Sequence, residues 1–454
     1  MSDHVVMVNC HFDSVPGSPG ASDDIVMCCV MMEMLRVLGQ KAEKQKHSIV
    51  FLFNGSEEED LQASHGFITQ HRWAKDVRAY INLESTGSGG REILFRSGPK
   101  HDWLVHLYRQ SAPRPFGQGV AEELFETGII PSATDFEIFR DDGEVPGLDF
   151  AYVEDGWRYH TQYDSIDYIT MDSVQYTGEN ILPLLRTMVN SDKLADPPEG
   201  TFAIYFDWLG LFMISYTYGV GIALNISISL LAFIIPFVIQ TKFKLANLWF
   251  VFTETLISFL TLLVSTILSA VACYLMAMIM NAADNTMSWF NIIFLAIGIY
   301  GSLAVVVQMA TYHLIQCLTD KFFKRKHDEE KTKSAKGEKL QIHLNGVTLF
   351  WTILTLVIVI MGYRFAYITM VITLFSLCTY LLTFTLCKFL PATSELKSSF
   401  EVKIFLKIYF FRNSKLDFCA SLGAFVPILV DLLHDDPSLG AFYPDHNQAV
   451  LRKP

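Results

Sequence analysis

Acidic side chains follow directly on an apolar segment in the stretch NGSEEED, residues 54–60. The segment before it ends in Ile49–Phe53, which is typical of a buried strand. An isolated acidic run is usually a solvated loop, so this one gains meaning only if other strands end in the same way. Carboxylates gathered at one edge of a sheet could bind a metal ion or transfer a proton.

Three further apolar segments also run into His, Asp or Glu. HVVMVNC runs into His11 and Asp13, YINL runs into Glu84, and LDFAYV leads through EDGWR to His160. In open sheets of parallel strands, ligands bind at the carboxyl ends of the strands. The pattern therefore predicts that these side chains meet at one edge of a sheet.

The chemistry that such a group suits is metal binding. Two histidines with several carboxylates form a ligand set suited to zinc, and two ions that share a bridging carboxylate need about five such groups. The stretch Gly20-Ala-Ser-Asp23-Asp24 adds carboxylates before a predicted helix, although such a pair is often only a helix cap. The five candidate ligands are His11, Asp23, Glu58, Glu84 and His160.

The elements that must position these residues alternate along the first part of the chain. Strands are predicted at Val5–Cys10, Ile49–Phe53, Ala79–Leu83, Ile93–Arg96 and Leu148–Val153. Helices are predicted at Asp24–Leu38, Ser64–Ala74, Asp102–Ser111 and Met171–Asn190. This alternation favours an α/β domain at residues 1–195, with a mainly parallel sheet flanked by helices on both faces.

The second part of the chain is much more apolar. Five long uncharged segments can each cross a hydrocarbon core about 30 Å thick, namely Gly219–Gln240, Thr255–Met280, Trp289–Gln316, Leu344–Tyr363 and Ala366–Phe389. Ala420–Leu433 is a weaker sixth candidate that carries Asp431. We expect a linker with an interfacial segment at 196–218, an all-α transmembrane bundle at 219–434 and a tail at 435–454. The uncharged spans offer no ion path, which argues against a transporter.

Charge orients the expected bundle and limits its partners. Residues 1–200 hold 16 Lys and Arg against 32 Asp and Glu, and the remainder holds 19 against 15. The acidic first part argues against nucleic acid as a partner. The loops between the predicted spans are alternately basic and non-basic, with eight Lys and Arg in Thr319–Gln341, and basic loops are usually cytosolic. The α/β domain is then expected in a lumen or outside the cell.

The eight cysteines show no CxxC pair or regular spacing. Three of them, Cys10, Cys28 and Cys29, lie in the α/β part. The spacing indicates neither a disulfide framework nor a thiolate zinc site. We therefore expect the cysteines to be core residues.

Four motifs in this order resemble the co-catalytic zinc aminopeptidase family, which includes bacterial leucyl aminopeptidases and glutamate carboxypeptidases. The motifs are HFDSVPGSPGASDD, NGSEEEDLQASHGF, YINLES and YHTQYDSID. With the multi-span region attached, essentially the whole chain resembles the membrane metallopeptidases of the endoplasmic reticulum within that family. The resemblance implies a zinc exopeptidase fold, two zinc ions per chain, and a peptide or protein substrate.

The resemblance also implies a role for each motif residue. His11 and His160 would each ligate one zinc ion, Asp23 would bridge the two, and Glu58 and Glu84 would complete the ligand set. Glu57 would be the general base, and Asp13 would accept a hydrogen bond from the second ring nitrogen of His11. Asp24 as the bridge, with Asp23 as a helix cap, is the alternative. Glu59 and Asp60 are expected to be solvated or structural.

The chain departs from the family pattern in two places. Glu84 stands where the family usually has Asp, although Glu is expected in the membrane-bound members. The chain also starts at the strand that carries His11, so we expect a shortened form without the family's first strands, helices and span, which can leave strand edges unpaired. Asp135 could bind the substrate amino group or hold a loop. Tyr159 and Tyr163 are expected to pack, although either could polarise a carbonyl.

These patterns predict a multi-pass membrane zinc exopeptidase of the aminopeptidase type, with its catalytic domain in the lumen of the endoplasmic reticulum. Two alternatives remain open. One is a catalytically silent membrane scaffold, and the other is a single-zinc enzyme like the glutaminyl cyclases, which resemble this family. The sequence indicates neither the side-chain preference nor the oligomeric state.

Overall fold

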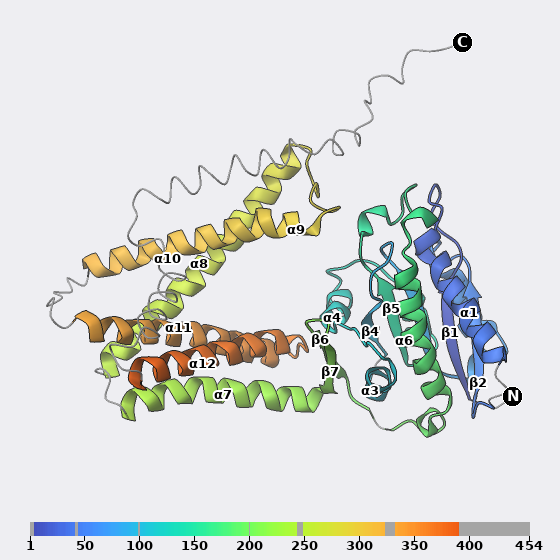
Figure 1. Ribbon diagram of the computed structural model, residues 1–454, viewed down its shortest axis with the longest axis horizontal. Coiled ribbons are helices and arrows are strands. Elements are labelled where there is room, and N and C mark those ends of the chain that lie inside the picture. Colours follow the sequence, from blue (N-terminus) through green and yellow to red (C-terminus); the bar gives the residue numbers. More distant parts are fainter. Residues whose placement is uncertain are drawn as a thin grey trace, which may run out of the picture. The chain divides into compact units, whose positions relative to one another are not determined.

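The structure, a computed structural model, describes residues 4–40, 44–98, 100–198, 200–242, 248–322 and 332–389 (Figure 1). Residues 1–380 form one compact unit, in which an α/β domain is followed by long helices. The predicted sixth span Ala420–Leu433, the tail at 435–454 and the basic KRK segment at 324–326 lie outside the described residues.

A five-stranded sheet forms the centre of the α/β domain. Its strands are β1 (Val5–His11), β2 (Ser48–Asn54), β3 (Val77–Ser85), β4 (Ile93–Ser97) and β5 (Gly147–Tyr152), in the order β2-β1-β3-β5-β4. All neighbours pair in parallel except β4, which runs antiparallel to β5. This confirms the predicted fold class. The carboxyl ends of β1, β2, β3 and β5 therefore meet at one edge.

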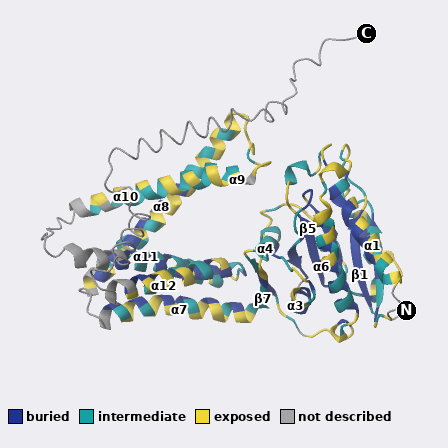
Figure 2. Ribbon diagram, viewed as in Figure 1, coloured by how far each residue is buried: buried dark blue, intermediate teal, exposed yellow. Residues whose placement is uncertain are grey.

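Strand β1 is buried on both faces because its side chains alternate between two hydrophobic clusters. Val6 and Val8 pack with α1 (Val26–Gln40), α3 (Asp102–Ser111) and α6 (Met171–Val189). Val5 and Met7 face the other way, toward α2 (Gln62–Gln70) and α5 (Asp135–Asp141). Figure 2 shows the buried strands between more exposed helices. Helices thus cover both faces, as expected for a parallel sheet.

Some boundaries differ from the predicted ones. The helix predicted from Asp24 begins at Val26, because Asp23 and Asp24 have non-helical backbone angles within the turn η1 (Ala21–Ile25). The helix predicted at Ser64–Ala74 ends at Gln70, since His71 is extended, and η2 (Ala74–Asp76) follows. The seven-residue helices α4 (Val120–Glu126) and α5 were not predicted, because they are too short for a clear period. Single turns occur at η3 (Gly156–Arg158), η4 (Ile166–Tyr168) and η5 (Asp192–Leu194).

The segment expected at a membrane interface forms a β-hairpin. Strands β6 (Ala203–Trp208) and β7 (Phe212–Thr217) pair antiparallel. Tyr205 and Met213 are buried in the hydrophobic cluster shared with α1, α3 and α6. The inward-facing side chains of the hairpin therefore belong to the core of the α/β domain, and its place at a membrane interface stays a prediction.

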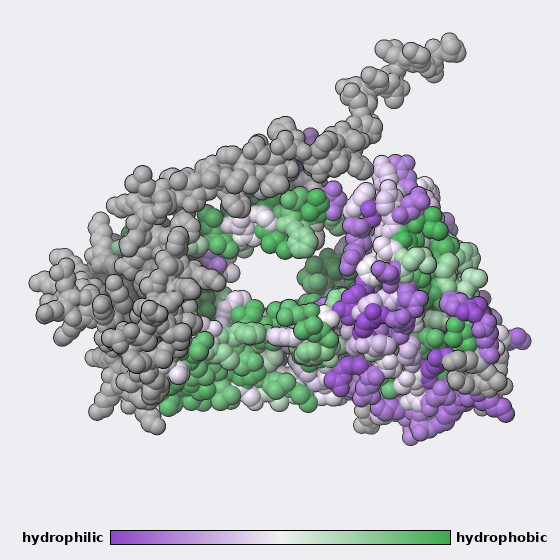
Figure 3. All heavy atoms as spheres, in the orientation of Figure 1, coloured by the Kyte–Doolittle hydropathy of each residue, from purple (hydrophilic) through white to green (hydrophobic). Residues whose placement is uncertain are grey.

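Helical segments follow the hairpin: α7 (Tyr218–Lys242), α8 (Leu248–Ala282), α9 (Ile293–Ala296), η6 (Ile297–Gly301), α10 (Ser302–Phe322), α11 (Thr332–Ile360) and α12 (Ala366–Phe389). Within the described residues, five stretches are long and apolar enough to cross a membrane: Tyr218–Gln240, Val251–Ala282, Phe294–Thr319, Gln341–Ile360 and Ala366–Thr385. Hydrophobic residues cover these helices, whereas hydrophilic residues gather over the α/β domain (Figure 3). Phe233 on α7 and Ile267 on α8 are more than half exposed, as lipid-facing side chains would be.

The predicted spans differ from these helices at several ends. The span predicted to reach Tyr363 ends at Ile360, because Gly362 takes a left-handed conformation with φ of 83°. The helix predicted from Trp289 begins at Ile293. The span predicted from Thr255 starts earlier, at Val251, and therefore includes the buried ionisable side chain of Glu254.

The prediction for the cysteines is wrong for one pair. Cys10 on β1 and Cys28 on α1 are both buried, as expected, but their sulfur atoms form a disulfide with a Cα–Cα distance of 5.7 Å. The sequence separation of 18 carries no motif that could have revealed this pairing. The bond joins the strand that carries His11 to the helix behind it.

We expect a Gly147→Ala substitution to destabilise the α/β domain. A Cβ at Gly147 would overlap the ring of the buried Tyr80, whose hydroxyl donates a hydrogen bond to the carbonyl of Phe136. Such overpacking costs about 1–3 kcal/mol of the free energy of unfolding, which thermal unfolding of the detergent-purified chain can measure. Gly178→Ala on α6 is the control, since its Cβ would meet nothing within 4 Å. An unchanged midpoint for Gly147→Ala would contradict this packing.

Candidate metal centre

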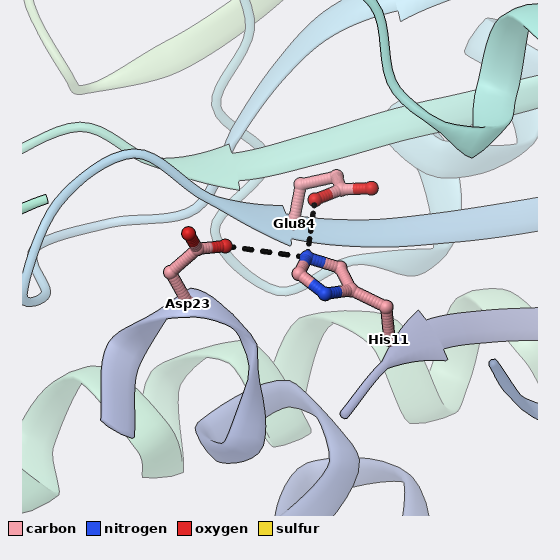
Figure 4. A group of neighbouring side chains, drawn as sticks. All are labelled: His11, Asp23 and Glu84. Atoms are coloured by element: carbon pink, nitrogen blue, oxygen red, sulfur yellow. Dashed lines mark ion pairs between the residues drawn. The ribbon is translucent and has the colours of Figure 1, made fainter. Parts of the chain in front are cut away.

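His11 lies at the carboxyl end of β1 and is 1% exposed. Its Nδ1 atom is 3.0 Å from the backbone carbonyl of Asp13. Its Nε2 atom lies 3.2 Å from Oδ1 of Asp23 and 3.4 Å from Oε2 of Glu84, so the three side chains point at one another (Figure 4). Because β3 is the neighbour of β1, the sheet itself brings Glu84 to His11.

Asp23 reaches this group from the turn η1. The turn begins after Gly20, whose left-handed φ of 65° suits glycine, and the peptide bond between Asp23 and Asp24 is cis. Asp164 holds the turn from outside. Its carboxylate accepts hydrogen bonds from the backbone N–H of Ser22 at 2.8 Å, from the Ser22 hydroxyl at 2.6 Å and from the backbone N–H of Asp23 at 3.1 Å.

Asp164 is a positioning residue that the sequence analysis missed. It is 1% exposed and lies four residues after His160 in the motif YHTQYD. Its place in the same motif as His160 could have drawn attention to Asp164. Nothing in the sequence, however, indicated that its carboxylate reaches back to the turn η1.

His160 and Glu58 form a second group around the same aspartate. The Nε2 atom of His160 lies 3.1 Å from Oδ2 of Asp23 and 2.9 Å from Oε1 of Glu58. The backbone of His160 has a φ of 60°, which is uncommon outside glycine. The ring of Tyr159 stacks on the imidazole with a centroid distance of 3.7 Å, which fixes its orientation.

Two groups that could each hold a metal ion therefore share Asp23. In each one, the potential ligand atoms of three residues lie within 4.8 Å of one another; the groups are His11, Asp23 and Glu84, and Asp23, Glu58 and His160. Oδ2 of Asp23 and Oε1 of Glu58 are buried, and both face Nε2 of His160. Buried carboxylate oxygens next to imidazole nitrogens fit zinc ions in this donor set.

The geometry favours Asp23 over Asp24 as the bridging ligand. Asp24 belongs to neither group. It is fully buried, and its Oδ2 atom accepts a hydrogen bond from the backbone N–H of His11 at 3.3 Å. Asp24 thus holds the backbone of a candidate ligand, and Asp23 caps no helix. The ligand roles themselves stay predictions.

Asp13 holds the loop that carries the two glutamates. Its carboxylate accepts hydrogen bonds from the backbone N–H groups of Glu57 and Glu58, each at 3.2 Å. One of the same oxygens lies 3.5 Å from Nδ1 of His11, farther than the backbone carbonyl does. Asp13 therefore links the segment after β1 to the glutamate loop after β2. Glu59 and Asp60 are exposed.

The centre carries an excess of buried negative charge. Burial, together with the nearby carboxylates of Glu84, Asp135 and Glu58, raises the pKa of Glu57 to about 10. Burial raises the pKa of Glu84 to about 7, although His11 opposes the shift. Burial lowers the pKa of His160, but its contacts with Asp23 and Glu58 outweigh this and raise it to about 9. Cations placed between these groups would relieve the repulsion.

A buried polar network supports Glu84 from behind, and the sequence analysis missed it. The amide nitrogen of Asn82 donates to Glu84 at 3.0 Å and to Asp149 at 2.9 Å, and its oxygen accepts from Asn9 at 2.7 Å. Nε of Arg96 on β4 donates to Asp149 at 2.9 Å. These residues stand side by side on four strands, so the sheet register creates a contact that no sequence spacing shows.

The geometry also bears on the remaining candidates. Asp135 is fully buried and accepts hydrogen bonds from the side chains of Asn9 at 2.9 Å and Asn54 at 2.6 Å, which favours a structural role over contact with a substrate. Tyr163 is 39% exposed and packs near Trp157 rather than in either ligand group.

The first part of the chain is similar to known peptidases. Residues 1–185 match the model of peptidase family M28. Endoplasmic reticulum metallopeptidase 1 of Homo sapiens is 43% identical over 330 residues, which cover 71% of this chain and 35% of the relative. Vacuolar membrane protease of Yarrowia lipolytica is 35% identical over 195 residues, or 42% of this chain and 19% of the relative.

The chain thus spans about a third of the length of the metallopeptidase that it matches. Among solved structures, a zinc aminopeptidase from Bacillus subtilis is 23% identical and covers 44% of this chain and 49% of its own, but the TM-score of 0.33 is too low to add to the comparison. The family match covers all five candidate ligands and the sheet that carries them. Residues 1–185 are therefore a peptidase family M28 domain, joined in one chain to helices of membrane-spanning length.

Proposed function

We propose that this chain is a membrane-bound, zinc-dependent exopeptidase of the aminopeptidase type, which hydrolyses peptide bonds with two zinc ions. The observation that carries the proposal is the pair of three-residue ligand groups that share Asp23. A site for one ion needs only one such group. The shared carboxylate therefore supports the two-ion enzyme over a single-zinc cyclase.

The family match supports the reaction class, and the arrangement of the residues supports the mechanism. Zinc ions bound here would supply Lewis acidity, which lowers the pKa of a water molecule to about 7 and polarises the scissile carbonyl. Glu57 belongs to neither ligand group, so its carboxylate stays free to accept the proton of that water and pass it to the leaving amine. Asp13 keeps Glu57 and Glu58 at fixed positions by holding their backbone N–H groups.

The different environments of the two adjacent glutamates give them different tasks. Glu58 faces His160 at 2.9 Å, in the second ligand group. The high pKa of Glu57 reflects burial among carboxylates, so cations between those carboxylates would lower it. Glu57 would then be ionised at neutral pH and able to act as a base.

We propose further that the chain lies in the endoplasmic reticulum membrane, with its catalytic domain in the lumen. The relatives that match most of the chain carry that compartment in their names. The basic and non-basic loops alternate along the sequence, and the Cys10–Cys28 disulfide suits an oxidising compartment. The M28 domain precedes the first candidate span, and the turn between α11 and α12 follows the fourth. Four crossings return the chain to the side on which it started, which agrees with the contact between this turn and the M28 domain.

We expect Glu57→Gln to abolish peptidase activity and to leave the metal content unchanged. A carboxamide cannot accept the proton, and loss of a general base costs about 10²–10⁴-fold in rate. The measurement is hydrolysis of a set of aminoacyl-nitroanilides and short peptides by the detergent-purified chain, with elemental analysis alongside. Glu59→Gln is the matched control, because Glu59 is exposed in the same loop. A Glu57→Gln variant as active as this control would refute the assignment.

We expect metal binding to weaken as the pH falls from 8 to 6. Without metal, the pKa of His160 is raised to about 9 and that of Glu84 to about 7, so His160 holds its proton over this whole range and Glu84 gains one within it. A metal ion must displace these protons, which lowers the apparent affinity by about tenfold per pH unit for each proton released. Calorimetric zinc titrations of the metal-free chain, in two buffers of different ionisation enthalpy, measure affinity and proton release. Equal affinity at both pH values without proton release would contradict the electrostatic description.

A further inference from the structure

Three glutamates of α4 surround one arginine from the membrane region. Arg364 lies in the short turn between α11 and α12, and its guanidinium donates to Glu122 at 2.6 Å and to Glu126 at 2.8 Å. The carboxylate of Glu123 accepts hydrogen bonds from the backbone N–H groups of Arg364 at 2.6 Å and of Phe365 at 2.7 Å. The turn therefore engages the helix with both its side chain and its backbone.

Most of this contact is buried, unlike an ordinary surface ion pair, and Glu126, with a side chain 43% exposed, lies at its rim. The side chain of Arg364 is 9% exposed, that of Glu122 3% and that of Glu123 6%. Burial lowers the pKa of Arg364, but the three carboxylates outweigh it and raise the pKa above its usual range. A buried charge that loses its partner is strongly destabilising, whereas an exposed pair contributes little. The acidic cluster on α4 thus depends on the cation that the turn supplies.

Apolar contacts surround the ion pairs and extend the interface onto the hairpin of β6 and β7. The ring of Tyr367 on α12 stacks on Phe206 of β6 with centroids 4.4 Å apart and planes at 2°. Its hydroxyl donates to the side-chain oxygen of Gln118 at 3.2 Å. Ile204 and Met370 are buried in the same cluster. The hairpin that follows the M28 domain therefore packs between that domain and the last described span.

We infer that the turn at residues 361–365 is a docking clamp, through which the membrane region holds α4 and the edge strand β4 of the M28 domain in place. Glu122 joins the two elements, because the same carboxylate accepts hydrogen bonds from the backbone N–H and the hydroxyl of Ser97 at the end of β4, each at 3.1 Å. The residue before Ser97 is Arg96, which bonds to Asp149 in the network behind Glu84.

The clamp gives the spans a role beyond anchoring. One helix would suffice to tether an enzyme to a membrane, but the clamp needs the α11–α12 hairpin to present Arg364 at the membrane surface. Among the described residues of the M28 domain, no Lys or Arg pairs with Glu122, whose cationic partner is Arg364 from the turn. The M28 domain and the spans would then behave as one folded unit. This inference does not rest on catalysis, since it concerns the stability of α4 and β4.

The test is hydrogen–deuterium exchange on the full chain in detergent micelles. We expect Arg364→Met to speed backbone exchange at least tenfold in α4 (Val120–Glu126) and β4 (Ile93–Ser97), with little change in α1 (Val26–Gln40). Arg36→Met is the matched control, because Arg36 pairs with Glu33 in an exposed (i, i+3) contact. Exchange in α4 and β4 as slow as in this control would overturn the inference.

A second pair of variants covers the case in which Arg364→Met does not fold. Arg364→Lys keeps the charge but cannot reach both Glu122 and Glu126 as the guanidinium does, so we expect an intermediate rise in exchange confined to α4 and β4. Adding Glu122→Gln to Arg364→Met removes one unpaired buried carboxylate and should restore part of the protection. Uniform acceleration across the M28 domain in Arg364→Lys, or no restoration by Glu122→Gln, would contradict a local clamp.

Discussion

An excess of buried carboxylates at one edge of a parallel sheet is the constraint on which the rest of this structure depends. Asp23 lies between two imidazoles, at 3.2 Å from His11 and 3.1 Å from His160, and three more acidic residues stand close by. Such a group is costly without cations, because each charge raises the pKa of the next. The surrounding fold holds the group together: Asp164 fixes the Asp23 turn, Asp13 fixes the glutamate loop, and Asn82 supports Glu84.

The sequence predicted those parts of the site that lie at strand ends. Apolar segments followed by His or Glu can be recognised locally in the sequence. Because the carboxyl ends of parallel strands meet at one edge of a sheet, His11, Glu58, Glu84 and His160 could be placed together. The sequence could not predict the contacts that depend on the register between strands, such as that of Asn82 with Asp149. Nor could it predict contacts between distant loops, such as that of Asp164 with Ser22. It also missed the short helix α4, and with it the partner of Arg364, because seven residues hold too few turns for a period.

The membrane region and the M28 domain meet through charge as well as apolar surface. The acidic composition of the first part of the chain argues against nucleic acid as a partner, but it does not reveal that Glu122 and Glu123 are buried. The matching cation, Arg364, lies in a turn of only five residues between α11 and α12. The arrangement ties the position of the membrane helices to the edge strand β4, whose Arg96 takes part in the network behind a candidate ligand.

Metal stoichiometry tests the central claim most directly. The folded, monodisperse fraction of the detergent-purified chain is analysed for zinc per polypeptide, with an Asp23→Asn variant beside it. The two groups that share Asp23 predict two zinc ions per chain, and they predict that the variant loses most of both, since Asp23 belongs to each group. One zinc ion per folded chain, or full retention of two in the variant, would contradict a two-ion centre bridged by Asp23.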